Sequence, residues 1–188
     1  MQNGANTLRS LTLFVSSHFM FNVLGKLQSE ILSGEKRQAV STLTLYSRLI
    51  RQACDFSTKE DISLNEEKRF LENYLKLEQE RFVETPFHYL FEDFDNELDL
   101  IVPFILQPFV ELAVLSGLGS TNPLLKISYS EINHSIRIES ERHNQEAANK
   151  LSEKCEIAQA RLLHFKFAYQ ATLTDSGFLQ DISLPEYK

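Results

Sequence analysis

The sequence predicts an α+β protein in which an N-terminal helical hairpin precedes a region that combines helices with a sheet. Three observations support this fold class. Apolar residues recur at helical spacing over residues 8–32 and again over residues 36–55. A capping box formed by Ser63 and Glu66 marks the start of a third helix. Short β-rich runs begin only near residue 88, so the strands come after the long helices.

The first two predicted helices each have one apolar stripe. The first helix is expected over residues 8 to about 32, with a stripe formed by Leu13, Met20, Leu24, Leu27 and Ile31. Residues 33–36 read as a turn, and the second helix is expected to reach Asp55, with a stripe formed by Val40, Leu43, Ser47, Ile50 and Cys54. A lone hairpin would expose these stripes, whereas a four-helix bundle would cover them, so we expect a homodimer.

The remaining elements predict a mixed region after a boundary near residues 57–61. The third helix is expected to run from the capping box to about Phe82. Strands are expected at residues 88–91, 98–101, 165–173 and 179–184, with a β-hairpin of residues 125–129 and 135–138. Two further helices are expected at residues 103–117 and 144–163.

Composition and charge exclude several classes of function. The net charge of -7 gives no positive field that would attract nucleic acid or an anionic membrane. Cys54 and Cys155 are far apart and lack neighbours at metal-ligand spacing, so neither a disulfide framework nor a zinc site is expected. The most apolar run, residues 101–115, is too short and too interrupted to span a membrane, and the N-terminus does not resemble a signal peptide. A cytoplasmic location is expected.

Residues 18–22 read His-Phe-Met-Phe-Asn. This run resembles Pro-His-Phe-Leu-Phe-Asn, the phosphoacceptor motif of the sensor histidine kinases that usually act with LytTR-type response regulators. Four other blocks of the sequence also resemble this family. The other blocks are similar to its second helix, the helix that leads into its ATPase domain, its N-box helix and its last strand. These blocks are residues 49–51, 64–67 with 72–75 and 81–82, 102–111 and 182–185. They follow the order and spacing of the family and cover nearly all of the chain.

The resemblance implies two domains and a set of partners. Residues 1–58 would form a dimerisation and phosphotransfer-like helical hairpin. Residues 59–188 would form a GHKL-type α/β sandwich, the fold also found in gyrase and Hsp90-like ATPases. The expected partners are a second copy of the chain, the receiver domain of a response regulator and a partner histidine kinase.

The nucleotide-binding motifs of the family are changed in this chain. Glu111 of the N-box is kept, but Leu112 replaces the Asn that would hold Mg²⁺, a cation that needs oxygen ligands. Ser140 stands where the resemblance places the Asp that binds adenine. Residues 138–143, and residues 152–157 ahead of Arg161, lack the glycines that let backbone N–H groups approach phosphate. A vestigial nucleotide site near Glu111, Ser140 and Arg161 is therefore expected to bind no ATP, and no metal or other cofactor is expected.

His18 and Asn22 are the candidate catalytic residues. Four residues apart on a helix, they share one face, opposite the stripe of Met20, Leu24 and Leu27. A reachable imidazole can act as a nucleophile toward phosphorus. Ser17 replaces the Pro that precedes the phosphoacceptor in the family.

Three functions remain open at this point. His18 could pass phosphoryl groups to or from a response regulator. Alternatively, the chain could be a catalytically inactive pseudokinase scaffold that binds and modulates kinases or regulators. The third reading is an active ATP-dependent histidine kinase with a divergent nucleotide pocket.

Overall fold

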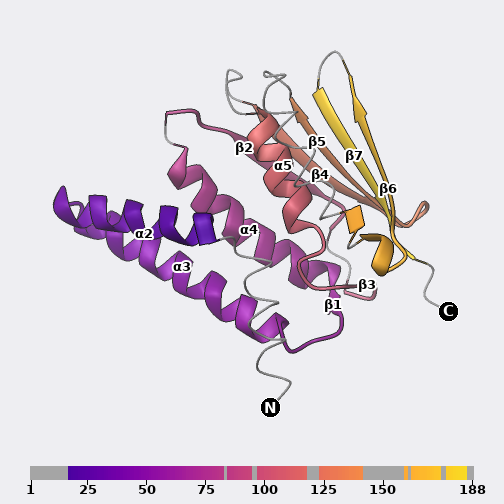
Figure 1. The fold of residues 1–188 in the computed structure, drawn as a ribbon, viewed down its shortest axis with the longest axis horizontal. Helices are drawn as coiled ribbons and strands as arrows, with labels where there is room; N and C mark the ends of the chain where they lie inside the picture. Colours follow the sequence, from indigo (N-terminus) through magenta and orange to yellow (C-terminus); the bar gives the residue numbers. More distant parts are fainter. Residues whose placement is uncertain are drawn as a thin grey trace.

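A computed structural model describes residues 17–82, 84–94, 97–117, 123–141, 159–160, 162–174 and 177–185, apart from the side chains of Ser17, His18 and Leu173. From left to right, Figure 1 shows a helical hairpin, a third helix, a fourth helix and a twisted sheet. The helical hairpin and the third helix precede the main sheet along the chain, as the sequence predicts. The helix expected over residues 144–163 lies almost wholly outside the described residues.

The hairpin consists of α2 (Ser17–Leu32) and α3 (Lys36–Phe56). Between them Gly34 has a φ of 78°, a conformation that costs glycine little because it has no Cβ. Two backbone bonds close the end of α2: the N–H of Glu35 donates to the carbonyl of Glu30 at 2.9 Å, and that of Gly34 to Ile31 at 3.2 Å. This pattern is a Schellman motif, and it fixes the predicted turn.

Helix α4 (Leu64–Arg81) begins at the predicted capping box. The N–H of Glu66 donates to Ser63 Oγ at 3.2 Å, and the N–H of Ser63 donates to Glu66 Oε2 at 2.9 Å. α4 lies between the hairpin and the rest of the molecule, and it packs along α3 (Figure 1). The ring of Phe70 on α4 contacts two other rings. Its centroid lies 6.1 Å from that of Phe56 on α3 and 5.0 Å from that of Phe104. One hydrophobic cluster therefore continues across the predicted boundary at residues 57–61.

The main sheet has five strands in the order β2-β4-β5-β7-β6. β2 runs parallel to β4, and the other neighbours are antiparallel. The strands are β2 (His88–Glu92), β4 (Leu124–Ser130), β5 (Ser135–Glu141), β6 (Ala168–Leu173) and β7 (Gly177–Ser183). A separate short pair joins β1 (Ile62–Ser63) to β3 (Leu100–Ile101), so the strand expected over residues 98–101 is shorter than predicted.

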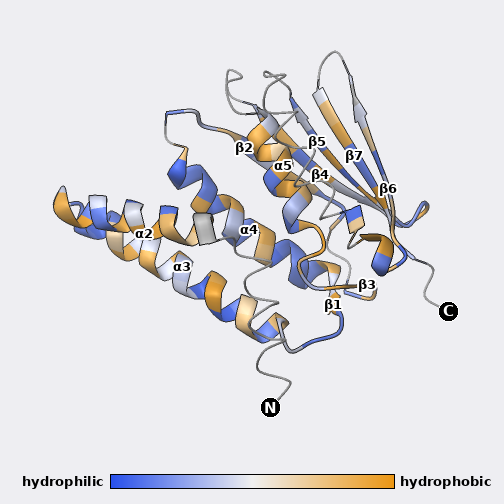
Figure 2. Cartoon of the chain, viewed as in Figure 1, coloured by the Kyte–Doolittle hydropathy of each residue, from blue (hydrophilic) through white to orange (hydrophobic). Residues whose placement is uncertain are grey.

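One face of the sheet is buried beneath α5 (Gln107–Gly117), which lies along it in Figure 1. Side chains alternate between the two faces of each strand, and the buried ones on β4, β5 and β7 point to this side. Figure 2 shows the corresponding mixture of apolar and polar residues along the strands. Ion pairs such as Arg137–Asp181, at 2.7 Å, occupy the exposed side.

The helix expected from residue 103 begins only at Gln107. Phe104 adopts a φ of 61°, which a continuous helix does not allow. The buried carboxylate of Glu67 accepts hydrogen bonds from the N–H groups of Phe104 and Leu106 at 2.9 and 3.2 Å. These bonds stabilise the turn before α5, in which the left-handed backbone of Phe104 keeps residues 103–106 out of the helix.

The apolar stripes predicted for the hairpin are only partly covered in a single chain. The sides that face α4 and each other carry Phe19 and Val23 on α2, and Leu49 and Ala53 on α3. The large apolar stripe residues that stay exposed are Leu24, Ile31, Val40 and Leu43, and Leu32 and Phe21 are exposed beside them. None of the helices described here is long and apolar enough to cross a membrane.

Candidate functional site

The two candidate catalytic residues lie at the start of α2. The backbone of His18 belongs to the first turn of the helix, and its side chain is outside the described atoms. Asn22 is half-buried, while Phe19 and Val23 are buried and face the rest of the molecule. The four-residue spacing places His18 and Asn22 on one face of a continuous helix, as the sequence predicts.

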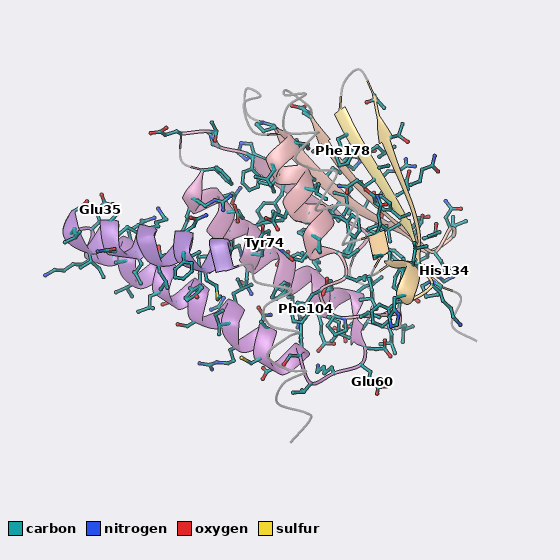
Figure 3. All side chains as sticks on the ribbon, viewed as in Figure 1. Glu35, Glu60, Tyr74, Phe104, His134 and Phe178 are labelled. Atoms are coloured by element: carbon teal, nitrogen blue, oxygen red, sulfur yellow. The ribbon has the colours of Figure 1, made fainter. Side chains whose placement is uncertain are left out.

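Tyr74 of α4 is the buried residue against which this turn of α2 rests. The rings of Phe19 and Tyr74 have centroids 5.1 Å apart. Figure 3 places Tyr74 near the centre of the molecule, beside the start of α2. Burial raises the pKa of Tyr74 well above its ordinary value, and the negative charges of Glu78 and Glu111 raise this pKa further. Its hydroxyl therefore stays protonated at neutral pH.

Glu111 is held within the fold by α5 itself. The side-chain amide of Gln107, one turn earlier, donates to Glu111 Oε2 at 3.4 Å. Gln107 also hydrogen-bonds Tyr74, so one amide connects α4 with the N-box helix. Leu112, the next residue of the N-box, is buried with 1% of its surface exposed. A buried hydrocarbon side chain offers no oxygen ligand to Mg²⁺.

Ser140 on β5 is turned into the interior, where its hydroxyl lies 2.7 Å from that of Ser116 on α5. Ser116 Oγ also donates to the carbonyl of Ala113 at 2.9 Å. Because a hydroxyl has one proton, Ser140 is the donor in the serine pair. Ser140, which the resemblance places at the position of the adenine-binding Asp, is thus bonded to α5 and is only 5% exposed.

The strands are closely packed beside this pair. A Cβ on Gly177 of β7 would lie 2.6 Å from the carbonyl oxygen of Ser140, a distance that real Cβ atoms do not adopt. On the other side, a Cβ on Gly117 would lie 3.3 Å from Pro123. Glycine is required at position 177 for the close approach of β5 and β7, whereas a Cβ at position 117 would need its neighbours to shift by a few tenths of an ångström. Arg161, the third residue of the expected vestigial site, lies outside the described residues.

The histidines whose side chains the structure describes do not assemble a second site. His88, His134 and His164 are exposed on separate elements. Within the described ranges, three or more His, Cys, Asp or Glu side chains nowhere gather as they would around a metal ion.

Sequence reasoning did not single out Tyr74, Gln107 or Ser116 as site residues. Only Gln107 carried a usable local signal, since it is four residues ahead of Glu111 and on the same helical face. Tyr74 and Ser116 gain their significance from contacts with α2 and β5, which local spacing does not reveal.

The hairpin, the sandwich and the position of His18 define a histidine kinase-like class of protein. A family model described as histidine kinase matches residues 6–85. The sensor histidine kinase YpdA of Escherichia coli K12 is 30% identical over 143 residues, which cover 73% of this chain and 24% of that protein. The chain belongs to the sensor histidine kinase family, a family of two-component signalling, and it spans about a quarter of the length of this relative.

Solved structures confirm the predicted fold class. A bacterial phosphotransferase aligns over 97% of this chain and 96% of its own, with a TM-score of 0.51 and 9% identity. The histidine kinase AdeS of Acinetobacter baumannii aligns over 90% of this chain and 95% of its own, with a TM-score of 0.50 and 14% identity. At these identities the likeness is one of fold, namely a helical element followed by a GHKL-type α/β sandwich.

Proposed function

We propose that this chain is a degenerate histidine kinase-like module that does not bind ATP. In this proposal it acts in the cytoplasm as a homodimer and passes phosphoryl groups through His18 to or from the receiver domain of a response regulator. A partner histidine kinase can supply the phosphoryl groups that this chain does not obtain from ATP.

The buried pair of Ser116 and Ser140 is the observation that carries the loss of ATP binding. An adenine site needs a carboxylate aimed into an open pocket, and here a short hydroxyl bonds the N-box helix instead. Leu112 is buried where an oxygen ligand would hold Mg²⁺. Because phosphoryl transfer from ATP depends on Mg²⁺ and on positioning of the triphosphate, these residues do not fit a kinase site.

Titration calorimetry with Mg-ATP tests this part of the proposal. We expect no binding at cellular ATP concentrations, and we expect the same for Ser140→Asp, because Leu112 and the missing glycines remain. Micromolar affinity in the wild type, with competition by ADP, would establish the alternative of a divergent active kinase.

Transfer from a phosphorylated receiver needs no nucleotide on this chain. The unprotonated nitrogen of the His18 imidazole attacks phosphorus, and a P–N bond forms. The P–O bond of the aspartyl phosphate breaks, the receiver's aspartate leaves as a carboxylate, and the ring loses its proton to solvent. The receiver contributes its own Mg²⁺ and carboxylates. Asn22, on the same helical face, would orient the imidazole or contact the receiver.

The relay is tested with a receiver domain that acetyl phosphate has phosphorylated. We expect acid-labile label on the wild type and on His134→Gln, which removes an exposed histidine elsewhere, and no label on His18→Gln. Unlabelled wild type that still binds the receiver would contradict the relay and would leave the pseudokinase scaffold.

The homodimer is supported by the apolar side chains that the hairpin leaves uncovered. Leu24, Ile31, Val40 and Leu43 are between 45% and 64% exposed in one chain. Light scattering should give twice the 21.7 kDa mass of the chain. Leu24→Asp should weaken the dimer, whereas Ile132→Asp, at a turn where the side chain is 94% exposed, should not. A monomer at tens of micromolar wild type would contradict this part of the proposal.

A further inference from the structure

An aromatic contact joins the first turn of α2 to α4. Phe19 directly follows His18, and its buried ring packs on Tyr74 with centroids 5.1 Å apart. Val23, one turn later, is the next buried residue on this side. Each residue turns a helix by about 100°, so the direction of residue 18 is fixed once the ring of Phe19 is seated. Rotation of α2 about its axis would lift Phe19 off Tyr74.

Tyr74 is itself fixed from the opposite side. Its hydroxyl hydrogen-bonds Gln107 in the first turn of α5, and Gln107 donates to Glu111. Glu78, one turn after Tyr74 on α4, is buried and forms an ion pair with Arg81 at 2.8 Å. The ring of Tyr74 thus faces α2, while its hydroxyl faces a polar cluster around the N-box helix.

We propose that Tyr74 is a positioning residue for His18, because it sets the rotation of α2 relative to α5 through Phe19 on one side and Gln107 on the other. This inference rests on the proposed relay through His18. It assigns to the remnant of the kinase domain the task of holding the phosphoacceptor helix in one orientation. Displacement of α5, by a bound partner for example, would reach His18 through Tyr74.

Two variants test the two contacts of Tyr74 one at a time. Phe19→Leu keeps an apolar side chain but removes the ring contact, and Tyr74→Phe keeps the ring but removes the bond to Gln107. The control for the first is Phe70→Leu, which removes an equally buried ring that contacts Phe56 and Phe104. The control for the second is Tyr169→Phe, which removes a hydroxyl that lies 3.2 Å from Gln180 Oε1 on the sheet. Each control loses as much packing or hydrogen bonding as the variant it is paired with, but at a residue that does not contact α2.

The first measurement is transfer from the phosphorylated receiver to His18, at several receiver concentrations. We expect Phe19→Leu to lower the rate at saturating receiver about tenfold, and Tyr74→Phe about threefold, because small errors in position slow a transfer reaction strongly. The receiver concentration that gives half the maximal rate should stay within about twofold of wild type, since docking is unchanged. The two controls should transfer at the wild-type rate.

The second measurement is the NMR signal of the His18 imidazole, identified by its absence in His18→Gln. We expect this signal to shift in Phe19→Leu and Tyr74→Phe but not in the two controls. If wild type takes no label, the relay fails, and the NMR comparison alone then decides the inference. Equal rates and an unmoved His18 signal in all four variants would overturn the positioning role, even with the relay intact.

Discussion

The two ends of α4 hold their neighbours with carboxylates in different ways. Near its start, Glu67 is fully buried and accepts two backbone N–H bonds from the turn before α5. Near its end, Glu80 Oε2 lies 2.9 Å from the hydroxyl of Thr42 on α3, and Glu30 Oε1 of α2 lies 3.2 Å from the same hydroxyl. One hydroxyl proton serves two carboxylates at this end.

Within the described part of the chain, the carboxylate inside the sandwich is hydrogen-bonded through both oxygens, whereas one at the junction with the hairpin is not. Lys26 lies 3.0 Å from Glu30 Oε1, but Glu30 Oε2 has no hydrogen-bond partner among the described residues, although Glu30 is buried. A buried polar atom that lacks a partner costs free energy, so the hairpin is attached at this end by apolar packing in spite of its polar groups. The junction is accordingly expected to open before the sandwich unfolds.

The largest expected effect is at the sandwich end. Glu67→Ala removes the acceptor of two buried N–H groups, and we expect the free energy of unfolding to fall by about 3–5 kcal/mol. Urea denaturation followed by circular dichroism measures this loss. Glu97→Ala, at an exposed carboxylate, serves as the control and should change stability little. A loss of stability below about 1 kcal/mol for Glu67→Ala would contradict the view that the carboxylate at the sandwich end of α4 stabilises the fold more than those at the hairpin end.

Thr42→Val tests the junction end with a nearly isosteric change. The valine cannot donate to either Glu30 or Glu80, and we expect a loss of about 1–3 kcal/mol, smaller than that of Glu67→Ala. Hydrogen exchange should show faster exchange in α2 and α3 than in the sheet. Thr44→Val is the control, since its exposed hydroxyl donates to the carbonyl of Val40 in the same helix, at 2.7 Å. Equal acceleration in hairpin and sheet would show that the two regions unfold together.

The raised pKa of Tyr74, midway along α4, predicts that the folded protein loses stability at alkaline pH. Its pKa is raised in the folded chain, so folding favours the protonated hydroxyl. This contribution is complete below the unfolded pKa of about 10 and is lost as the pH rises above it, by about 1.4 kcal/mol per pH unit. Unfolding of wild type and Tyr74→Phe should be compared at pH 9 and pH 11. The decrease in stability should be smaller in the variant, and identical decreases would contradict the burial of a neutral Tyr74.

The smallest effect is expected for Glu30→Gln. The amide removes one of the two carboxylates at the Thr42 hydroxyl and supplies an N–H donor, but it also ends the ion pair with Lys26. We expect the free energy of unfolding to rise by about 0.5–1 kcal/mol, because a part-exposed ion pair contributes little. The matched control is Glu35→Gln at the exposed turn. If Glu30→Gln lowered the free energy of unfolding, both carboxylate oxygens of Glu30 would have favourable partners in the folded chain, contrary to this prediction.

Local patterns predicted most of the secondary structure. The capping box at Ser63, the β4–β5 pair and the hairpin from residue 17 onward are confirmed, because each depends on residues close together in the sequence. Residues 8–16 of the predicted first helix lie outside the described residues. The start of α5 was wrong by four residues. The predicted start at residue 103 fails because Phe104 adopts a left-handed backbone conformation, in a turn whose N–H groups are bound by Glu67, 37 positions earlier. A helix boundary in a turn bound by a distant carboxylate has no local signal.

The candidate site was predictable only in part. The family motifs located His18, Asn22 and Glu111, and the spacing of His18 and Asn22 placed both on one face of a helix. The apolar stripe of Leu24 and Ile31 was found from its periodicity, but periodicity does not distinguish the face that packs within a chain from the face that remains open. Phe19, which immediately follows His18, is buried against Tyr74.

By itself, the sequence determined the order of the described elements and the family, and its resemblance to that family places Leu112 and Ser140 at positions where nucleotide-binding residues are expected. These properties depend on residue identity and on spacings of two to four residues. Only the tertiary structure decided that Ser140 bonds Ser116, 24 positions away, and that Tyr74 lies between Phe19 and Gln107. Such contacts depend on how the helices and the sheet dock. Docking follows from burial of the whole core at once, so the sequence of no single segment predicts it.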